Sequence, residues 1–315
     1  MAVRANRRSK SHRMLIPATV HPHYRQVATS VGQLQDVHFE TVAYRGEDGR
    51  IASGDLEAHG GGDVTALVIQ QPNFLGNLEE VDALTDWAHA RGALVIAVVN
   101  PTALALLEPP GEWGERGADI VVGDGQPLGC PLSSGGPYFG FMATRQEFVR
   151  QMPGRIVGRT VDLDGRPGFT LTLQAREQHI RRGKATSNIC TNQGLLMMAG
   201  TVYLALMGAE GLARVARACM ARTAELVAAL TALPGVRPAF AAPRFHEAVL
   251  LFDRPVAPLL AALAQRGIQG GYDLSGTYPE LGHALLVCAT EMRGAADIAA
   301  YAGALGGLLR GARAA

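Results

Sequence analysis

The stretch Asp119-Ile-Val-Val-Gly-Asp-Gly-Gln-Pro-Leu-Gly-Cys-Pro-Leu-Ser-Ser-Gly-Gly-Pro-Tyr-Phe-Gly-Phe141 decides the fold. It begins with an apolar run, residues 120–122, of the kind that forms a buried strand. A turn rich in glycine and proline follows, and residues 138–143 are predicted to form the next strand. Glycine between buried strands indicates that the backbone passes close to a ligand or to another chain. Composition alone favours the alternative, a tight strand connection, whereas Gln126, discussed below, favours the close approach to a ligand or another chain.

Strands and helices alternate upstream of this stretch. We predict strands over residues 13–17, 37–44, 65–70 and 94–99, and helices over 22–32 and 78–91. Such alternation is typical of a mostly parallel sheet covered by helices on both faces. Ligands bind at the carboxyl ends of the strands in these sheets. The loops of interest are therefore residues 21–22, 70–73, 100–102 and the turn around Gln126.

The chain changes character downstream of the stretch. Residues 145–192 are densely basic and punctuated by glycine, which indicates an extended excursion over another surface. Residues 195–207 are strongly apolar, as in a helix packed on all sides. Further helices are predicted over 212–233, 257–266 and 295–309, and strands over 248–252 and 284–289. We therefore divide the chain into a large domain, residues 1–210, and a small C-terminal α/β domain, residues 211–315.

Composition limits the classes of function. The chain has 315 residues, 48% of them hydrophobic and 18% charged, with a net charge of +1. Near-neutral charge argues against nucleic acid or an anionic membrane as the main partner. The basic cluster at residues 4–13 is interpreted as a solvated turn. No apolar run approaches the roughly 20 residues of a membrane span, and no secretory signal follows the N-terminus. A cytoplasmic protein is expected.

The four cysteines are Cys130, Cys190, Cys219 and Cys288. They lie far apart and lack the spacing of metal ligands, so no metal site is expected. We interpret them as buried thiols in a reducing compartment.

Four motifs carry a family resemblance: residues 21–25, the glycine-rich turn with residues 135–138, residues 151–158, and Glu177-Gln-His-Ile-Arg-Arg-Gly-Lys-Ala-Thr-Ser-Asn-Ile-Cys-Thr-Asn192. Together they resemble the P-protein of the glycine cleavage system over essentially the whole chain, and in particular subunit 1 of its two-subunit bacterial forms. The resemblance implies an α/β fold of the PLP-dependent transferase class (aspartate aminotransferase type, fold type I). It also implies that a segment upstream of Met1, which meets the cofactor phosphate in this fold, is missing from this chain.

The resemblance also implies that this chain has lost the residues that hold the cofactor. Registering the motifs places Gln126 where the Schiff-base lysine stands, and a glutamine cannot form an imine. Asn100, 26 residues before Gln126, stands where the fold has an acid against the pyridine nitrogen. His21 corresponds to the residue that stacks on the cofactor ring and survives as a relic. We therefore expect no catalytic residue in this chain and treat these three positions as a pseudo-site.

Lys184 is the rival Schiff-base lysine, since a buried lysine can have a depressed pKa. It lies 58 residues beyond Gln126, in a basic run. In the fold that the resemblance implies, the equivalent loop reaches across the subunit interface toward the neighbour's cofactor phosphate. Lys184, Thr186, Ser187 and Asn188 offer donors suited to that anion. A purely structural interface loop is the alternative.

The resemblance predicts a non-catalytic but required subunit of glycine decarboxylase, also called glycine dehydrogenase (aminomethyl-transferring). It implies that glycine is decarboxylated on the complex and that the aminomethyl group passes to the lipoylated H-protein. The lysine, and with it pyridoxal 5'-phosphate, would belong to the partner, subunit 2. Two alternatives remain open at this point. One is a self-contained PLP-dependent lyase or transferase that uses Lys184, and the other is an inactive N-terminally truncated fragment.

Overall fold

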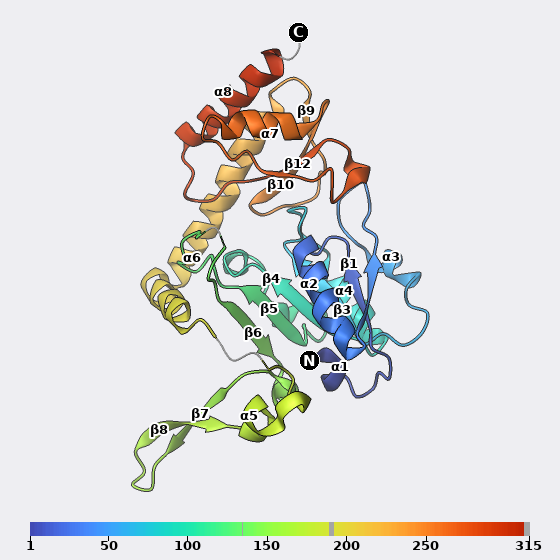
Figure 1. Ribbon diagram of the computed structural model, residues 1–315, viewed down its shortest axis with the longest axis vertical. Helices are drawn as coiled ribbons and strands as arrows, with labels where there is room; N and C mark the ends of the chain where they lie inside the picture. Colours follow the sequence, from blue (N-terminus) through green and yellow to red (C-terminus); the bar gives the residue numbers. More distant parts are fainter. Residues whose placement is uncertain (134, 189–191, 312–315) are drawn as a thin grey trace.

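A computed structural model describes residues 1–133, 135–188 and 192–311. Its centre is a six-stranded sheet with the order β2-β1-β3-β4-β5-β6 (Figure 1). The first five strands are parallel, and β6 runs antiparallel to β5. The strands are β1 Arg13–Pro17, β2 His38–Val42, β3 Ala66–Gln71, β4 Leu94–Val99, β5 Ile120–Asp124 and β6 Gly140–Thr144. The predicted mostly parallel sheet is confirmed.

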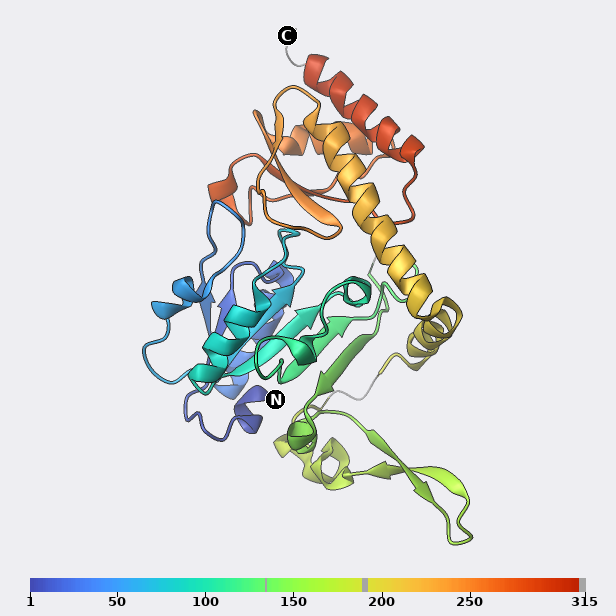
Figure 2. The same ribbon diagram turned by 180° about the vertical axis from the view of Figure 1, so that it is seen from behind.

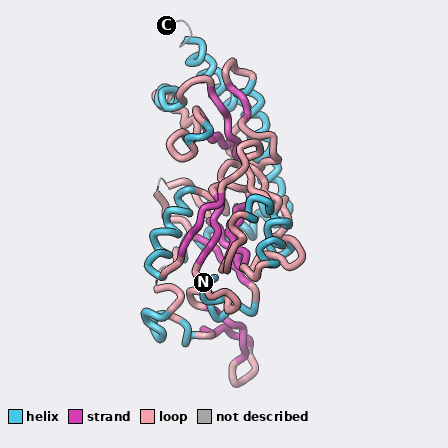
Figure 3. Tube along the Cα trace, turned by 90° about the vertical axis from the view of Figure 1, so that its right-hand side faces the viewer, coloured by secondary structure: helices cyan, strands magenta, loops and turns pink. Residues whose placement is uncertain are grey.

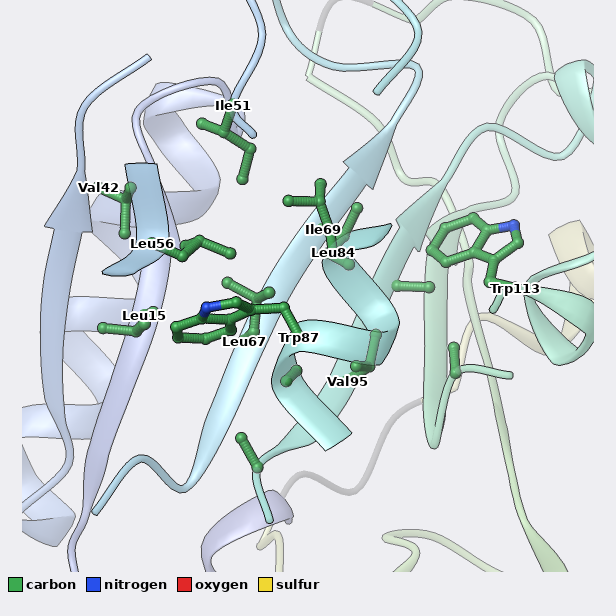
Figure 4. Close-up of a cluster of buried hydrophobic side chains, with 14 of the residues drawn as sticks. Leu15, Val42, Ile51, Leu56, Leu67, Ile69, Leu84, Trp87, Val95 and Trp113 are labelled. Atoms are coloured by element: carbon green, nitrogen blue, oxygen red, sulfur yellow. The ribbon is translucent and has the colours of Figure 1, made fainter. Parts of the chain in front are cut away.

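Helices cover both faces of this sheet. α2 (Pro22–Gly32) lies on one face and α4 (Val81–Ala90) on the other, as Figures 1 and 2 show from opposite sides. Because side chains alternate along a strand, neighbouring residues of β1 enter different cores. Leu15 packs with Leu67 and Trp87 in the cluster of Figure 4, whereas Ile16 packs with Val68 on the other face. The remaining short elements of this domain are α1 Ala2–Ala5, η1 Gln33–Gln35, α3 Ser53–Glu57, η2 Ala103–Ala105 and η3 Pro110–Glu112.

The basic, glycine-rich segment forms an arm. After η4 (Gln146–Gln151), strands β7 (Ile156–Val161) and β8 (Pro167–Thr172) pair into a two-stranded hairpin that projects away from the body (Figures 1 and 2). The chain returns through η5 Gln174–Arg176, α5 Gln178–Arg181 and η6 Arg182–Lys184. The predicted extended excursion is present, and the other surface that it would cover stays a prediction.

Helix α6 (Gly194–Thr231) links the arm to the second domain and is broken at Gly208, whose φ is 61° and ψ −178°. The expected domain boundary after residue 210 falls just beyond this break and stays a prediction. By length and composition the whole helix could cross a membrane, with an 18-residue window of mean hydropathy 1.5, so the expectation of no such run is wrong. The break shortens the continuous helix before Gly208 to roughly 21 Å, less than the ~30 Å of a bilayer core.

The first part of α6 is not packed on all sides, which corrects a second expectation. Leu195 is 80% exposed and Leu206 81%, and Met198 and Val202 are also exposed. The apolar composition of residues 195–207 predicted burial, and within this chain that burial does not occur.

The small domain is a four-stranded antiparallel sheet, order β11-β12-β10-β9, on which α6, α7 (Val256–Ala264) and α8 (Ala295–Gly311) pack. Its strands are β9 Val236–Pro238, β10 Glu247–Phe252, β11 Tyr272–Asp273 and β12 Ala284–Cys288, and η7 covers Pro279–Leu281. Strands β9 and β11 were not predicted, because two or three residues carry no periodicity. Figure 3 shows this domain at the opposite end of the molecule from the arm.

The cysteines are only partly as expected. Cys130 and Cys219 are buried, but Cys288 is exposed at the end of β12, and Cys190 lies outside the described residues. Burial is the first cause that raises the pKa of the Cys219 thiol to about 12, and a hydrogen bond to Glu291 adds to it. Such a thiol is unreactive at neutral pH. Among the described residues no group of His, Cys, Asp and Glu could hold a metal ion.

Candidate functional site

The structure brings three of the expected site residues to one edge of the central sheet. His21 follows β1, Asn100 follows β4 and Gln126 follows β5. These strands are parallel, so all three residues lie at the carboxyl edge, where ligands bind in such sheets.

His21 presents a neutral aromatic ring at this edge. Its backbone N–H donates to Gln70 Oε1 at 2.8 Å, and its Nδ1 accepts from the backbone N–H of His23 at 3.1 Å. The ring stacks on Tyr24 with centroids 4.7 Å apart and meets the edge of Phe74 at 4.6 Å. Burial, followed by the positive charges of His23 and Arg25, lowers the pKa of His21 to about 4. The ring is therefore uncharged at neutral pH and can stack on another flat ring.

Asn100 uses its side-chain oxygen locally. Oδ1 accepts from the backbone N–H of Thr102 at 2.9 Å and from that of Ala103 at 3.2 Å, which holds the turn that leads into η2. The residue provides no acidic group at the end of β4. It can offer only neutral donors to a ligand.

Gln126 closes the glycine-rich turn. Its Nε2 donates to the carbonyl oxygen of Cys130 at 2.7 Å, and its backbone N–H donates to Asp124 Oδ1 at 2.9 Å. Both bonds hold the turn in shape, so Gln126 has a structural role in this chain and no nucleophilic group.

The glycines of this turn make room for the chain's own aromatic rings. A Cβ on Gly123 would lie 2.3 Å from the ring of Phe141, and one on Gly125 would lie 2.3 Å from the ring of Phe139. The close approach is therefore to neighbouring side chains, and for these two glycines the tight strand connection is the correct reading. A cavity of about 440 Å³ lies beside the turn, lined mainly by apolar groups with Tyr24 and Asp124.

The loop that contains Lys184 lies at the opposite, amino edge of the sheet. Arg4 Nη1 donates to the carbonyl oxygen of Lys184 at 2.9 Å and to Thr186 Oγ1 at 3.5 Å. Asn6, two residues later, binds the carbonyl oxygens of Thr65 and Gly92, immediately before β3 and just before β4. Lys184 and Asn188 are exposed, and Thr186 and Ser187 are half-buried. The structure therefore does not bring this loop together with His21, Asn100 and Gln126.

The chain contains only two lysines, Lys10 and Lys184. The backbone N–H of Lys10 donates to Asp63, which precedes β3, so Lys10 also lies at the amino edge. Neither amine lies beside the carboxyl edge.

Sequence reasoning missed an aromatic bridge between the domains. Phe74 stacks on Tyr278 of the small domain with centroids 6.0 Å apart, and Tyr278 Oη donates to the carbonyl oxygen of Ala18 at 2.7 Å. Both contacts cover the His21 side of the site. Sequence patterns are local, so they do not predict a contact between Phe74 and Tyr278, which are about two hundred positions apart.

Glu79 was also missed. It is 6% exposed, and its two oxygens accept from the backbone N–H of Ile51 at 3.0 Å and from Asn73 Nδ2 at 2.8 Å. Burial raises its pKa to about 7, although these hydrogen bonds act in the opposite direction. A shifted pKa can mark a functional group, but here the partners are structural.

Comparison with known proteins shows the family of the chain. The family model described as "Glycine cleavage system P-protein" matches residues 1–305. Two relatives are named "Probable glycine dehydrogenase (decarboxylating) subunit 1". That of Thioalkalivibrio sulfidiphilus is 62% identical over 302 residues, 96% of this chain and 67% of the relative. That of Methylococcus capsulatus is 59% identical over 309 residues, 98% of this chain and 68% of the relative. The chain thus spans about two thirds of their length.

Solved structures place the fold in the same class. A crystal structure of glycine decarboxylase (P-protein) in inhibitor-bound form superposes with a TM-score of 0.87 at 40% identity, covering 98% of this chain and 68% of that one. A sphingosine-1-phosphate lyase from Burkholderia pseudomallei superposes with a TM-score of 0.69 at 18% identity, covering 98% and 65%, and shows the fold alone. The expected fold type I architecture is confirmed.

Proposed function

The chain belongs to the glycine cleavage system P-protein family, and on that premise we propose that it is subunit 1 of a two-subunit glycine decarboxylase. In this proposal subunit 2 carries the catalytic lysine and pyridoxal 5'-phosphate. The assembled enzyme decarboxylates glycine and passes the aminomethyl group to the lipoylated H-protein. This chain contributes no catalytic residue, binds no nucleic acid or membrane, and works in the cytoplasm.

The position of the two lysines is the observation that carries the assignment of the cofactor to the partner. An imine with the cofactor needs an amine, and the only side-chain amines, Lys10 and Lys184, lie at the amino edge of the sheet. The carboxyl edge holds Asn100 and Gln126, whose side chains are engaged in local turns. These residues do not fit a covalently held pyridoxal phosphate. The same separation argues against a self-contained enzyme that uses Lys184.

Exposed apolar surface supports an obligate partner. Leu195, Met198 and Leu206 on α6 and Val31 on α2 are exposed, as is Phe169 on the arm. Exposed apolar side chains grouped along one element, as on the first part of α6, mark an interaction site. Permanent complexes bury over roughly 2,000 Å². If the chain were an inactive fragment, this exposed surface would not bind subunit 2.

We assign the loop of Lys184, Thr186, Ser187 and Asn188 to the phosphate of the partner's cofactor. A cavity of about 540 Å³ beside this loop is lined by Lys184, Thr186 and four arginines, Arg4, Arg150, Arg176 and Arg181. This concentration of positive charge suits an anion presented across an interface. The alternative, a loop that only builds the interface, predicts no effect on the cofactor.

Spectroscopy with the purified chain tests the assignment of the cofactor. Added pyridoxal phosphate should give no imine absorbance, and borohydride should fix no pyridoxyl group on the chain. The complex with subunit 2 is the positive control and should be labelled on subunit 2. A pyridoxyl-Lys184 peptide that disappears in Lys184→Arg would overturn the assignment and favour the self-contained enzyme.

The phosphate loop is tested by Ser187→Ala in the complex. A hydrogen bond to a charged acceptor contributes ~1.5–3 kcal/mol, so cofactor affinity should fall roughly ten- to a hundredfold. Assembly should be unchanged, because the substitution removes little packing. Equal affinities for the cofactor in wild-type and variant complexes would leave only the structural interface loop.

A further inference from the structure

A third cavity, of about 330 Å³, lies at the amino edge of the central sheet. Its walls come from the N-terminal turn, the start of β4, the segment before β5 and η4. It shares Arg4, Arg150 and Gln151 with the cavity beside Lys184, but its other lining residues differ. Its size is at the lower end of small-molecule sites.

The lining carries a large excess of positive charge for a protein of net charge +1. Five arginines line it: Arg4, Arg7, Arg8, Arg116 and Arg150. Within the described ranges, none of the five lies within 4.0 Å of a carboxylate oxygen. The lining carboxylates are Asp119 and Glu147.

Asp119 does not neutralise these arginines, because it is already engaged. Its Oδ2 lies 2.9 Å from His89 Nε2 and accepts from the backbone N–H of Val95 at 2.8 Å. Its Oδ1 pairs with Arg145 Nε at 3.1 Å. Asp119 therefore fixes the orientation of the His89 ring in the wall of the cavity.

His89 provides an observation independent of the arginines. The side chain is only 7% exposed, and its Nδ1 has no hydrogen-bond partner in the part of the chain that the structure describes. The imidazole of His89 thus adds a buried polar group to the lining of the cavity.

The arginine-bearing turn is held in place rather than loose. Asn6 Nδ2 donates to the carbonyl oxygens of Thr65 and Gly92, and Asn6 Oδ1 accepts from the backbone N–H groups of Arg8 and Ser9. Asn6 is 5% exposed. The turn that we interpreted from the sequence as merely solvated is thus anchored on the sheet edge with its arginines beside the cavity.

We propose that this cavity binds a small multivalent phosphate-bearing anion. Guanidinium groups match phosphate oxygens in geometry as well as charge. The volume of about 330 Å³ favours a small anion over an acidic segment of a partner protein. Arg7, Arg8 and Arg116 distinguish the site from the cavity beside Lys184, with which it shares Arg4 and Arg150, and the proposal does not depend on the proposed function.

The test is calorimetric titration of inorganic pyrophosphate into the full chain, alone and in complex with subunit 2. The variant Arg8→Gln/Arg116→Gln removes two exposed charges from the cavity, and Arg237→Gln/Arg293→Gln removes two exposed charges elsewhere. We expect the first variant to weaken pyrophosphate binding by roughly tenfold or more and the control to change it less than about twofold. A nucleoside diphosphate titrated in parallel distinguishes free pyrophosphate from the phosphates of a larger molecule.

Equal pyrophosphate affinities in both variants would overturn the proposal, as would no binding by the wild-type chain. If subunit 2 abolishes pyrophosphate binding and Arg8→Gln/Arg116→Gln weakens the heteromer, an acidic partner surface occupies the cavity and the proposal is wrong. Glycine decarboxylation by the complex, which should not change in Arg8→Gln/Arg116→Gln, separates failure of this site from failure of the proposed function.

Discussion

Replacing Glu79 by glutamine should remove a pH dependence of stability that this one buried acid creates. The native pKa is about 7, against 4.5 for the unfolded group. Below pH ~4.5 the group is protonated in both states, so its native burial has no ionisation cost. As the pH rises from there to above 7, the unfolded chain releases the proton first. The native state then binds more protons, and stability falls with rising pH.

The magnitude follows from the shift in pKa. Linkage of one group with these two pKa values lowers the free energy of unfolding by about 2.5 kcal/mol between pH 5 and pH 8. Glutamine cannot ionise, so this slope should vanish. The variant loses one acceptor for Ile51 or Asn73, which costs about 1–3 kcal/mol independently of pH.

Urea unfolding followed by tryptophan fluorescence gives the measurement. The chain has two tryptophans, Trp87 and Trp113, and both lie in the core of the large domain. The quantity to compare is the difference in unfolding free energy between wild type and Glu79→Gln at each pH. Glu247, whose pKa burial also raises to about 7, is present in both chains and cancels.

Glu115→Gln is the matched control, because Glu115 is exposed and its removal should leave the pH profile unchanged. The reasoning is refuted if the profiles of wild type and Glu79→Gln run parallel from pH 5 to pH 8. A wild-type chain that gains stability over this range relative to the variant would mean that the sign is wrong and that hydrogen bonds outweigh burial.

Three further predictions concern the domain junction and the partner. Tyr278→Phe removes the 2.7 Å hydrogen bond to Ala18 and should lower the unfolding free energy by about 1 kcal/mol in urea; an unchanged value would mean that water replaces it. Gly76→Ala should cost about 2 kcal/mol or more, because φ is +86° and the added Cβ would lie 2.3 Å from the carbonyl oxygen of Glu247; a near-native melting temperature would contradict this. Met198→Glu should leave folding intact but weaken association with subunit 2, as measured by sedimentation. Undiminished association would show that α6 is not part of the interface.

Local features of the sequence determined the main elements and the family. β1 and β4 have the bounds predicted from the sequence, because each contains a short apolar run that a buried strand requires whatever its neighbours are. The motif from Glu177 to Asn192 was specific enough to indicate the P-protein family, although Ile189, Cys190 and Thr191 lie outside the described residues. Short strands such as β11 were not predicted, because β11 is defined by its pairing with β12 and not by a pattern of its own.

Only the tertiary structure decided where the loop of Lys184 lies. The predicted parallel sheet already placed His21, Asn100 and Gln126 at its carboxyl edge, whereas the return of the arm takes Lys184 to the opposite edge. The same long-range packing buries Glu79 and leaves the apolar face of α6 bare. These outcomes depend on contacts between residues tens to hundreds of positions apart. Local sequence indicates whether a residue can be buried or can bind a ligand, but the tertiary structure determines which residues it contacts.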